Sequence, residues 1–381
     1  MGHSNCRMLF VTSFDVRIID SIKTDGSMFR LLKEVVLQYE DTCDLFLFTG
    51  DTKTCELAPS IKHVPCSLFH KFGLWHASYA ILSAFKIAKY LKGNALVRGF
   101  SAACPAAIVA AKAKGKPSLV FYEYNWAYQV KYVNKGKMFG ALAQLIEDYV
   151  IRNADVVITR NASLENEARQ RGAKRVVIIP LTFDEQVFKP GIDVTELKKT
   201  YHVGDEKILM FIGRLHPVKR LDLLLNAVAK LNDDFKLFIV GTGTLEGELR
   251  EMAQSLGIAH KVVFTGAVHY SEVPKYMNMA DLIVMTSSVE GQPRVLIEAM
   301  SCGTPAVGTA VFGIKDTIED GVTGYVTSDD PADIADKITK ALTNIALPQM
   351  CRSVSLEKYS NEACALKEKM LCKELLHLDS A

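Results

Sequence analysis

Short runs of apolar and β-branched residues alternate with helical stretches along the whole chain. Alternation of this kind is typical of parallel β-sheets whose two faces are covered by helices. The strands expected in the first half are 8–12, 44–48, 94–97, 118–122, 155–159 and 176–179. Those expected in the second half are 208–212, 236–240, 262–265, 282–285, 305–307 and 324–326. Each set suffices for one doubly wound sheet, so the sequence predicts an α/β protein.

A chain of 381 residues is long for one core and suits two domains of ordinary size. The segment 180–191 is bracketed by prolines and is followed by a polar helix at 195–201, which is typical of a linker. We therefore predict an N-terminal domain of residues 1–185 and a C-terminal domain of residues 186–354, with a helical tail at 355–381 that packs back on the first domain. Open parallel sheets bind ligands beyond the carboxyl ends of their strands, so a cleft between the two domains is the expected site.

The overall composition excludes few classes of function. A formal net charge of +2 and 23% charged residues give no reason to expect a nucleic-acid partner. The nine cysteines are scattered and include no C-x-x-C pair, so we expect reduced thiols rather than a zinc site or a redox dithiol. The sequence shows no signal peptide and no apolar run long enough to cross a bilayer. We expect a cytoplasmic protein, with peripheral contact at the inner membrane face left open.

The segment 281–298 predicts a buried strand, a glycine turn and the start of a helix. Glu290 lies in the turn and Glu298 lies just inside the helix. The start of a helix offers free N–H groups and the positive end of the helix dipole, so it attracts phosphate. Carboxylates fit beside a phosphate that carries hydroxyl-rich groups, because an ionised carboxylate accepts two hydroxyl hydrogen bonds. A nucleotide-diphosphate sugar, with ribose at one end and hexose at the other, has this chemistry.

Two cations lie at the start of the second half. Arg214 and Lys219 follow the expected strand 208–212 and the glycine turn at Gly213. Cations at the carboxyl edge of a sheet can hold a diphosphate and stabilise the charge that grows on it as a glycosidic bond breaks, without a metal ion. Ordinary surface charges are the alternative interpretation of either residue alone.

In combination, these motifs resemble the C-terminal domain of retaining glycosyltransferases of the GT-B fold, the glycosyltransferase-four family. The resemblance runs from about residue 207 to 345 and includes Gly213-Arg214, Lys219, the Glu290 and Glu298 pair, and the motifs Gly303-Thr-Pro-Ala-Val307 and Gly321-x-x-Gly324. It implies two Rossmann-like domains that face each other across a cleft. It also implies transfer of a hexose-type sugar from a nucleotide-diphosphate sugar to a glycan, lipid-linked or small-molecule acceptor, with retention and without a metal or other cofactor. Polysaccharide or glycolipid biosynthesis would be the context.

The resemblance also assigns roles to individual positions. Arg214 and Lys219 match the pair that contacts the donor diphosphate, Glu290 matches the carboxylate that faces the transferred sugar, and Glu298 matches the acid that binds the ribose hydroxyls. Arg214, Lys219 and Glu290 are thus the expected catalytic residues, and Glu290 is expected to position and stabilise charge rather than to act as a nucleophile. A capping carboxylate is the alternative for Glu298. The complete set of expected donor-binding residues is Gly213, Arg214, Lys219, Val268, His269, Glu290, Gly291, Gln292, Arg294, Val295, Glu298 and, from the first domain, Gly26.

The first half departs from the family pattern. A single glycine, Gly26, stands where members usually have a paired-glycine loop, and the histidine common after the fourth strand is absent. Either Glu123, Tyr124 or Asn125 contacts the sugar on the acceptor side in place of that histidine, or the acceptor is bound differently. The donor nucleotide stays open among UDP, GDP and ADP.

The segment 70–92 mixes aromatic and aliphatic residues with Lys71, Lys86, Lys89 and Lys92. Such a helix can lie on anionic lipid, which would suit a lipid-linked acceptor. A helix that packs on the core with its lysines in water is the favoured interpretation.

Three other functions are possible for a chain with two Rossmann-like halves. A dinucleotide oxidoreductase is disfavoured, because neither first strand is followed by G-x-G-x-x-G and the motif Gly241-Thr-Gly243 lacks the third glycine. A sugar-nucleotide epimerase or a non-catalytic nucleotide-sugar-binding protein of the same fold remains the alternative.

Overall fold

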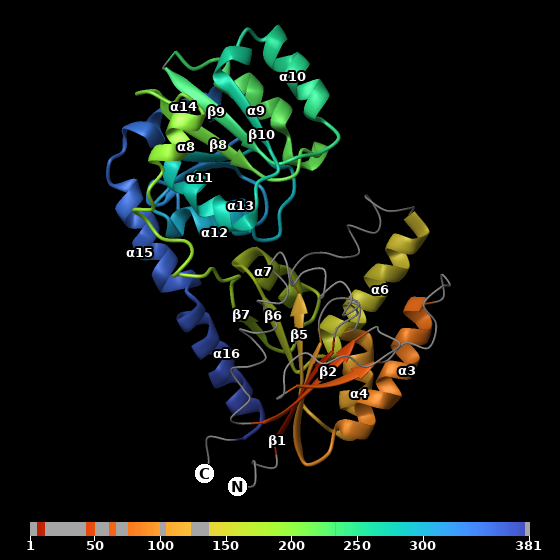
Figure 1. Ribbon diagram of the computed structural model, residues 1–381. Coiled ribbons are helices and arrows are strands. Elements are labelled where there is room, and N and C mark those ends of the chain that lie inside the picture. Colours follow the sequence, from red (N-terminus) through yellow and green to blue (C-terminus); the bar gives the residue numbers. More distant parts are fainter. Residues whose placement is uncertain are drawn as a thin grey trace. The chain divides into compact units, whose positions relative to one another are not determined.

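The computed structural model describes residues 6–11, 43–49, 61–65, 75–99, 104–122, 137–232 and 234–377. The chain divides into two compact units, shown in Figure 1. The N-terminal unit comprises Met1–Ile179 and Ala365–Ala381, and the C-terminal unit comprises Pro180–Cys364. Each is a parallel sheet with flanking helices, so the predicted α/β class is confirmed.

The N-terminal unit contains a seven-stranded parallel sheet in the order β3-β2-β1-β4-β5-β6-β7. Its strands are β1 Cys6–Val11, β2 Asp44–Thr49, β3 Ile61–Pro65, β4 Asn94–Gly99, β5 Ser118–Tyr122, β6 Val156–Thr159 and β7 Val176–Ile178. Six of them lie where the sequence predicts strands. The sequence did not predict β3, an edge strand that carries lysine, histidine and proline and so lacks the apolar run of a central strand.

The described helices of the N-terminal unit are α3 Trp75–Tyr90, α4 Cys104–Lys114, α6 Lys137–Asn153, α7 Ala162–Gln170 and most of α16 Asn361–Leu375. The last helix is tied to the sheet by a buried ion pair, in which Arg98 of β4 lies 2.5 Å from Glu368. The Arg98 guanidinium also stacks over the rings of Phe10 and Phe121. Burial raises the pKa of the Glu368 carboxyl, and the neighbouring Arg98 opposes that rise.

The C-terminal unit contains a six-stranded parallel sheet in the order β10-β9-β8-β11-β12-β13. Its strands are β8 Lys207–Ile212, β9 Phe235–Val240, β10 Val262–Gly266, β11 Leu282–Met285, β12 Ala306–Thr309 and β13 Gly324–Thr327, as the sequence predicts. Its α-helices are α8 Thr195–Thr200, α9 Leu221–Val228, α10 Glu246–Ser255, α11 Val273–Met279, α12 Arg294–Ser301, α13 Ile314–Thr317, α14 Pro331–Thr343 and α15 Leu347–Tyr359.

Alternate residues of the central strands enter two separate apolar cores, one on each face of this sheet. Met210 and Phe238 belong to one core, whereas Leu209, Phe211 and Leu237 belong to the other. The chain runs outward from β8 to β9 and β10 and then returns to add β11 on the other side of β8. The strand order therefore reverses between β8 and β11, which is where open α/β sheets bind ligands.

The segment 180–191, expected to be a linker, packs into the C-terminal unit. Phe183 and Phe188 are fully buried in its core, and Phe183 forms a β-bridge with Ser360. The units accordingly divide at Ile179/Pro180 and at Cys364/Ala365, whereas the sequence suggested 185 and 355. The predicted tail is shared between the units, because α15 and the residues up to Cys364 lie in the C-terminal one.

The expectation that every cysteine is reduced is wrong for two of them. Cys6 and Cys43 form a disulfide bond, since they stand at the start of the neighbouring strands β1 and β2. Cys302 and Cys351 are free and buried, Cys104, Cys364 and Cys372 are also buried, and Cys55 and Cys66 lie outside the described residues. Burial raises the pKa of Cys302 and of Cys351 to about 12, so neither thiol is a nucleophile at neutral pH.

No helix in the part of the chain that the structure describes is long and apolar enough to cross a membrane.

Candidate active site

The loop after β8 is held against the end of β9. Gly213 N–H donates to the Val240 carbonyl, and Leu215 N–H donates to the Thr242 carbonyl, both at 2.9 Å. A Cβ atom on Gly241 would lie 2.0 Å from the Gly213 oxygen, so this position requires glycine. The motif Gly241-Thr-Gly243 thus serves close packing of two loops of the sheet edge.

The loops after β8 and β11 are bonded to each other. The Thr286 hydroxyl donates to the carbonyls of Lys219 and Arg220, at 3.0 and 2.8 Å, and Ser288 N–H donates to the Val218 carbonyl at 2.8 Å. Arg220 adopts a left-handed backbone conformation with a φ of 49°, which is uncommon for a residue other than glycine. These bonds hold Lys219 at the end of the short helix Pro217–Lys219, beside the β11 loop.

Lys219 and Glu290 form an ion pair between the Lys219 Nζ and the Glu290 Oε1 atoms. Their side chains are only 20% and 14% exposed. The Ser287 hydroxyl donates to the same carboxylate oxygen at 2.7 Å. Among the described residues, the other oxygen of Glu290 accepts no hydrogen bond, so it is available to a ligand. The structure thus brings together two predicted residues that are far apart in the sequence.

Arg214 is exposed, and within the described ranges its side chain makes no hydrogen bond or ion pair. It follows Gly213 directly and lies in the same loop as Lys219. A guanidinium without a protein partner is free to form a bidentate contact with an anion.

The turn after Glu290 leads into α12, which begins at Arg294 after Pro293 with no side-chain cap. In the described structure, the N–H groups of Arg294 and Val295 make no hydrogen bond. Unpaired amides and the positive end of the helix dipole favour an anion at this point. Both amides were predicted for this purpose.

Gly313 packs closely against the turn that contains Glu290, a role that the sequence did not predict. A Cβ atom at this position would lie 2.2 Å from the Gly291 carbonyl oxygen and 2.8 Å from that of Glu290. Its φ of +84° also lies in the region that side chains rarely adopt. Because Gly313 has no side chain, the loop after β12 can pack directly against the backbone of the Glu290 turn.

We expect Gly313→Ala to lower the free energy of unfolding by about 2–4 kcal/mol, of which about 1–2 kcal/mol comes from the left-handed backbone and the rest from overlap with the turn. Gly257→Ala is the matched control, because Gly257 has a φ of +73° but nothing within 4 Å of the added Cβ atom. Denaturant titration of both variants separates backbone strain from overlap. Equal losses would show that the turn accommodates the methyl group.

Glu298 is buried, with 4% of its surface exposed. Its Oε1 atom accepts a hydrogen bond of 2.8 Å from the Tyr270 hydroxyl, and Arg294 Nε lies 3.9 Å from the same oxygen. The Tyr270 ring packs edge-on against Phe188. Tyr270, which sequence reasoning missed, therefore fixes the orientation of this carboxylate.

The loop after β10 precedes Tyr270 and holds the other two residues predicted there. Val268 packs against the apolar core. His269 is exposed and caps the short helix Tyr270–Glu272, since its Nδ1 atom accepts from Ser271 N–H at 3.4 Å. His269 thus stands next to the residue that holds Glu298.

Gln292 has a partner within the protein that the sequence did not reveal. Its side-chain oxygen accepts a hydrogen bond of 2.7 Å from Leu181 N–H. This oxygen anchors the start of the C-terminal unit to the turn, so a ligand would have to use the side-chain NH₂ group.

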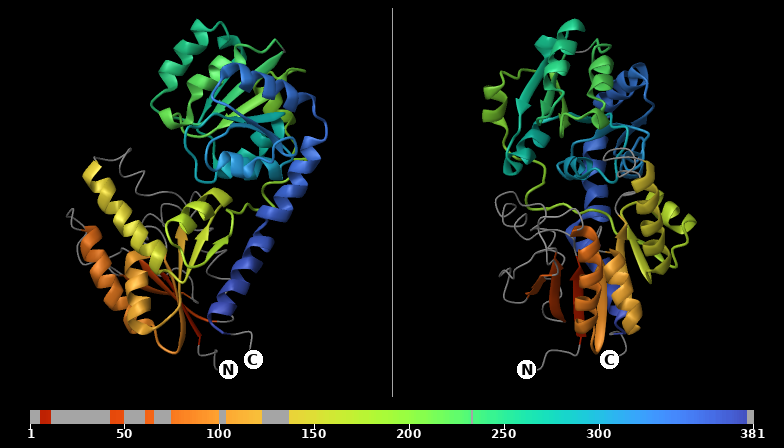
Figure 2. Two further views of the ribbon diagram at one scale, coloured as in Figure 1. Left: turned by 180° about the vertical axis from the view of Figure 1, so that it is seen from behind. Right: turned by 90° about the vertical axis from the view of Figure 1, so that its right-hand side faces the viewer.

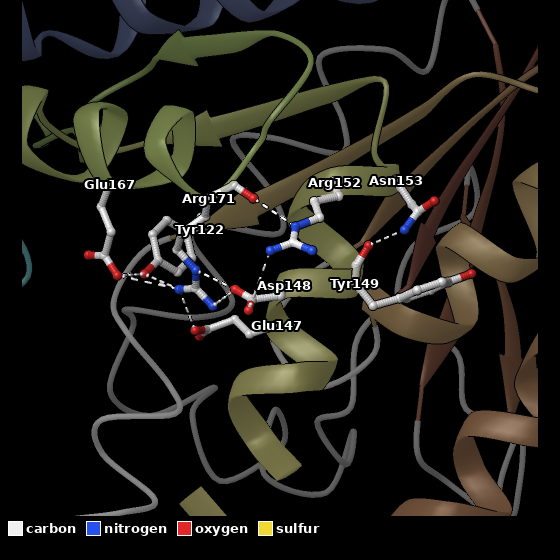
Figure 3. A network of polar contacts seen from close by, with 8 residues as sticks. All are labelled: Tyr122, Glu147, Asp148, Tyr149, Arg152, Asn153, Glu167 and Arg171. Carbon is white, nitrogen blue, oxygen red and sulfur yellow. Dashed lines mark hydrogen bonds and ion pairs between the residues drawn. The ribbon is translucent and has the colours of Figure 1, made fainter. Parts of the chain in front are cut away.

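The predicted residues of the N-terminal unit, Gly26, Glu123, Tyr124 and Asn125, lie outside the described residues. The preceding residue, Tyr122, ends β5 in a network of polar side chains from β5, α6 and α7, shown in Figure 3. The Tyr122 hydroxyl donates to Glu167 at 2.7 Å. Burial and the nearby Glu147 carboxylate raise the pKa of Tyr122, so it remains protonated.

Arg171 is the centre of that network. It donates to Glu147 and Asp148 at 2.7 Å and to the Tyr122 hydroxyl at 2.9 Å. The network fixes the end of β5, from which the chain continues into residues 123–125.

Residues 193–355 match the protein family described as glycosyl transferases group 1. This part of the chain is therefore similar to that family. It includes every described donor-site residue named above. Among the described residues, no three His, Cys, Asp or Glu side chains are grouped so that they could hold a metal ion.

Two curated proteins are similar in sequence to about half of this chain. A D-inositol 3-phosphate glycosyltransferase of Geodermatophilus obscurus is 34% identical over 215 residues, which cover 51% of this chain and 47% of that protein. An N-acetyl-alpha-D-glucosaminyl L-malate synthase of Bacillus anthracis is 34% identical over 198 residues, covering 50% of this chain and 51% of the relative. The matches thus span about half the length of these relatives.

Solved structures extend the likeness to nearly the whole chain. Sucrose-phosphate synthase from Thermosynechococcus elongatus has a TM-score of 0.75 at 20% identity, covering 98% of this chain and 99% of that chain. HepE from Anabaena, solved with UDP and glucose, has a TM-score of 0.72 at 17% identity, covering 97% and 99%. This likeness shows the fold, and the predicted GT-B architecture of two α/β domains is confirmed.

Proposed function

We propose that this protein is a retaining glycosyltransferase that moves a hexose-type sugar from a nucleotide-diphosphate sugar to a hydroxyl group of a glycan, lipid-linked or small-molecule acceptor, without a metal ion. The observation that carries the proposal is the Lys219–Glu290 pair at the edge where the strand order reverses between β8 and β11. Beside it lie an arginine and two amides that have no partner among the described residues.

In this proposal the diphosphate is held by Arg214, Lys219 and the amides of Arg294 and Val295. Breaking the bond between the sugar and the diphosphate places additional negative charge on the departing phosphate. Fixed donors that already point at that position stabilise the charge without reorganisation. Glu298, oriented by Tyr270, would accept hydrogen bonds from the ribose hydroxyls.

Glu290 has the geometry of a positioning residue. One carboxylate oxygen is engaged by Lys219 and Ser287, and the other is available to a sugar hydroxyl. We propose that the acceptor oxygen attacks the anomeric carbon from the face that the diphosphate leaves, and that a phosphate oxygen takes the acceptor's proton. The new bond then has the configuration of the old one, and the protein contributes alignment and charge stabilisation.

Similar proteins suggest which donors to test. HepE has been solved with UDP-glucose, and a Mycolicibacterium smegmatis relative, 34% identical over 178 residues, is named as a GDP-mannose-dependent mannosyltransferase of phosphatidylinositol monomannoside. We therefore include uridine and guanosine donors together with ADP-glucose.

Thermal-shift measurements with UDP-glucose, GDP-mannose and ADP-glucose test donor binding first. A donor at 100 times its Kd stabilises the folded state by about 2.7 kcal/mol, which raises the Tm measurably. Radiolabelled forms of the binding donor are then incubated with lipid and glycan acceptors, and the anomeric configuration of the product is determined by NMR. Labelled product with the donor's configuration supports the proposal. An epimerised donor, or binding without transfer, contradicts it.

The same assay tests metal independence. We expect the transfer rate to be unchanged by EDTA and by added Mg²⁺, because protein cations and amides neutralise the diphosphate. A rate that falls in EDTA and returns with Mg²⁺ would contradict this part of the proposal.

A further inference from the structure

Three helices of the N-terminal unit form a continuous layer on one face of its sheet. The middle helix, α4, packs against both α3 and α6, and the Lys112 Nζ of α4 donates to the Asn153 side chain of α6. Figures 1 and 2 show the three helices as neighbours, in orange and yellow. Each buries one side on the sheet, as Ile87, Ile108 and Ile151 illustrate, and directs the opposite side outward.

The outward side of this layer, here called the α3–α4–α6 face, carries exposed apolar side chains. They are Phe85 (70% exposed), Leu145 (67%), Leu142 (54%), Val109 (46%) and Tyr149 (41%). Within the described part of residues 1–179, every exposed large apolar side chain lies on these three helices. Apolar exposure concentrated in this way is characteristic of an interaction surface, whereas scattered single residues are not.

The same face is rich in cations. Those on the three helices or directly after them, among the side chains that the structure describes, are Lys86, Lys89, Lys92, Lys112, Lys114, Lys116 and Arg152. Helices α3 and α4 contain no acidic residue, and the two carboxylates of α6, Glu147 and Asp148, are bound by Arg171. Because the whole chain has a net charge of only +2, the positive charge is concentrated here.

Each of the three helices places a cation about one turn after an exposed apolar side chain, on the same side of the helix. The three helices run in the same direction, since each returns from the carboxyl edge of a parallel sheet to the start of the next strand. Phe85, Val109 and Tyr149 each lie about one turn before the end of their helices. The last turns carry Lys89, Lys112 and Arg152. Apolar side chains can thus enter the acyl boundary of a bilayer while the long cationic side chains reach the headgroups.

We propose that the α3–α4–α6 face binds the surface of an anionic phospholipid membrane. Charge decides between membrane and protein as the occupant: the described residues of the face offer many cations, and the two carboxylates of α6 are bound by Arg171, which fits a surface of phosphates. The surface is larger than the segment 70–92 suggested by the sequence, because α4 and α6 contribute four of its five exposed large apolar side chains among the described residues. Binding is independent of the proposed sugar transfer, since neither donor nor acceptor takes part in it.

The test is sedimentation of the full-length protein with two kinds of vesicles, pure phosphatidylcholine and phosphatidylcholine with 30% phosphatidylglycerol. We expect binding to the anionic vesicles alone, weakened at high salt because headgroup attraction is screened. Lys89→Glu/Lys114→Glu should weaken partition about 20-fold or more, given the contribution of each lysine near such a surface. Phe85→Ser/Leu145→Ser should weaken it about 10-fold or more, because the apolar contact is lost.

Two matched controls separate the face from general effects. Lys230→Glu/Lys367→Glu makes the same change of net charge at exposed positions elsewhere. Leu366→Ser/Met370→Ser removes two apolar side chains of similar exposure, 58% and 62%, from α16. Circular dichroism checks that all variants are folded.

The outcomes separate clearly. Loss of binding in the two face variants and normal binding in both controls supports the proposal. Equal effects of face and control variants, or no binding of the wild type to either vesicle, overturns it. The proposal is also wrong if sedimentation velocity shows a dimer that Phe85→Ser/Leu145→Ser dissociates, because a second copy would then occupy the face. Each result leaves the transfer assay unaffected, so the two proposals fail separately.

Discussion

Replacing Glu290 by glutamine is expected to lower kcat by about 10²–10³-fold, the range seen when one preorganised electrostatic group is removed from an active site. The amide keeps the size of the side chain and can still accept the hydrogen bond from Ser287. It removes the negative charge that pairs with Lys219 beside the transferred sugar. Donor affinity should change little, because Arg214, the α12 amides and Glu298 remain in place.

Single-turnover kinetics and calorimetry with the donor measure the two effects separately. Glu272→Gln is the control, because Glu272 forms an ion pair of 2.7 Å with Lys275 in the same unit, but both side chains are about half exposed. An exposed pair of this kind contributes little. If Glu290→Gln transfers sugar at the wild-type rate, the role proposed for Glu290 is wrong.

Replacing Lys219 by alanine should impair both donor binding and turnover. A hydrogen bond to a charged group contributes about 1.5–3 kcal/mol, so the donor Kd should rise about 10- to 100-fold. A second effect adds to this loss, because Glu290 keeps its charge without the cation and repels the diphosphate. Lys275→Ala, at the exposed pair, is the control and should bind the donor normally.

A double variant distinguishes the two causes. In Lys219→Ala/Glu290→Gln the repulsion is removed, so donor affinity should recover in part relative to Lys219→Ala, although turnover remains low. Non-additivity of this kind is the signature of residues in direct contact. An unchanged donor Kd in Lys219→Ala would show that the lysine does not contact the diphosphate.

Strand positions were readable from the sequence because most strands of a parallel sheet are apolar on both sides and end at polar or glycine residues. The exception, β3, lies at a sheet edge where Lys62 is exposed, so its sequence carries no such signal. The packing of 180–191 was misjudged for a related reason. Its prolines suggested a linker, whereas the burial of Phe183 and Phe188 depends on a core assembled from distant segments.

Sequence motifs predicted the donor-site residues. They did not predict the residues that orient or pack against those donor-site residues. The hydroxyl of Tyr270, in the loop after β10, donates a hydrogen bond to Glu298. Gly313 has no side chain, which lets it pack closely against the turn that contains Glu290. Neither role has a local pattern in the sequence. The Cys6–Cys43 bond was missed because it depends on which strands are neighbours in the sheet.

The Arg98–Glu368 ion pair has a consequence for how the chain is made. Arg98 belongs to β4 of the first sheet, and its counter-charge is on a helix near the opposite end of the chain. Both side chains are buried, and removing one partner of a buried ion pair is strongly destabilising. During synthesis on the ribosome, the C-terminal unit can therefore fold before the N-terminal unit, which is completed only when α16 has been made.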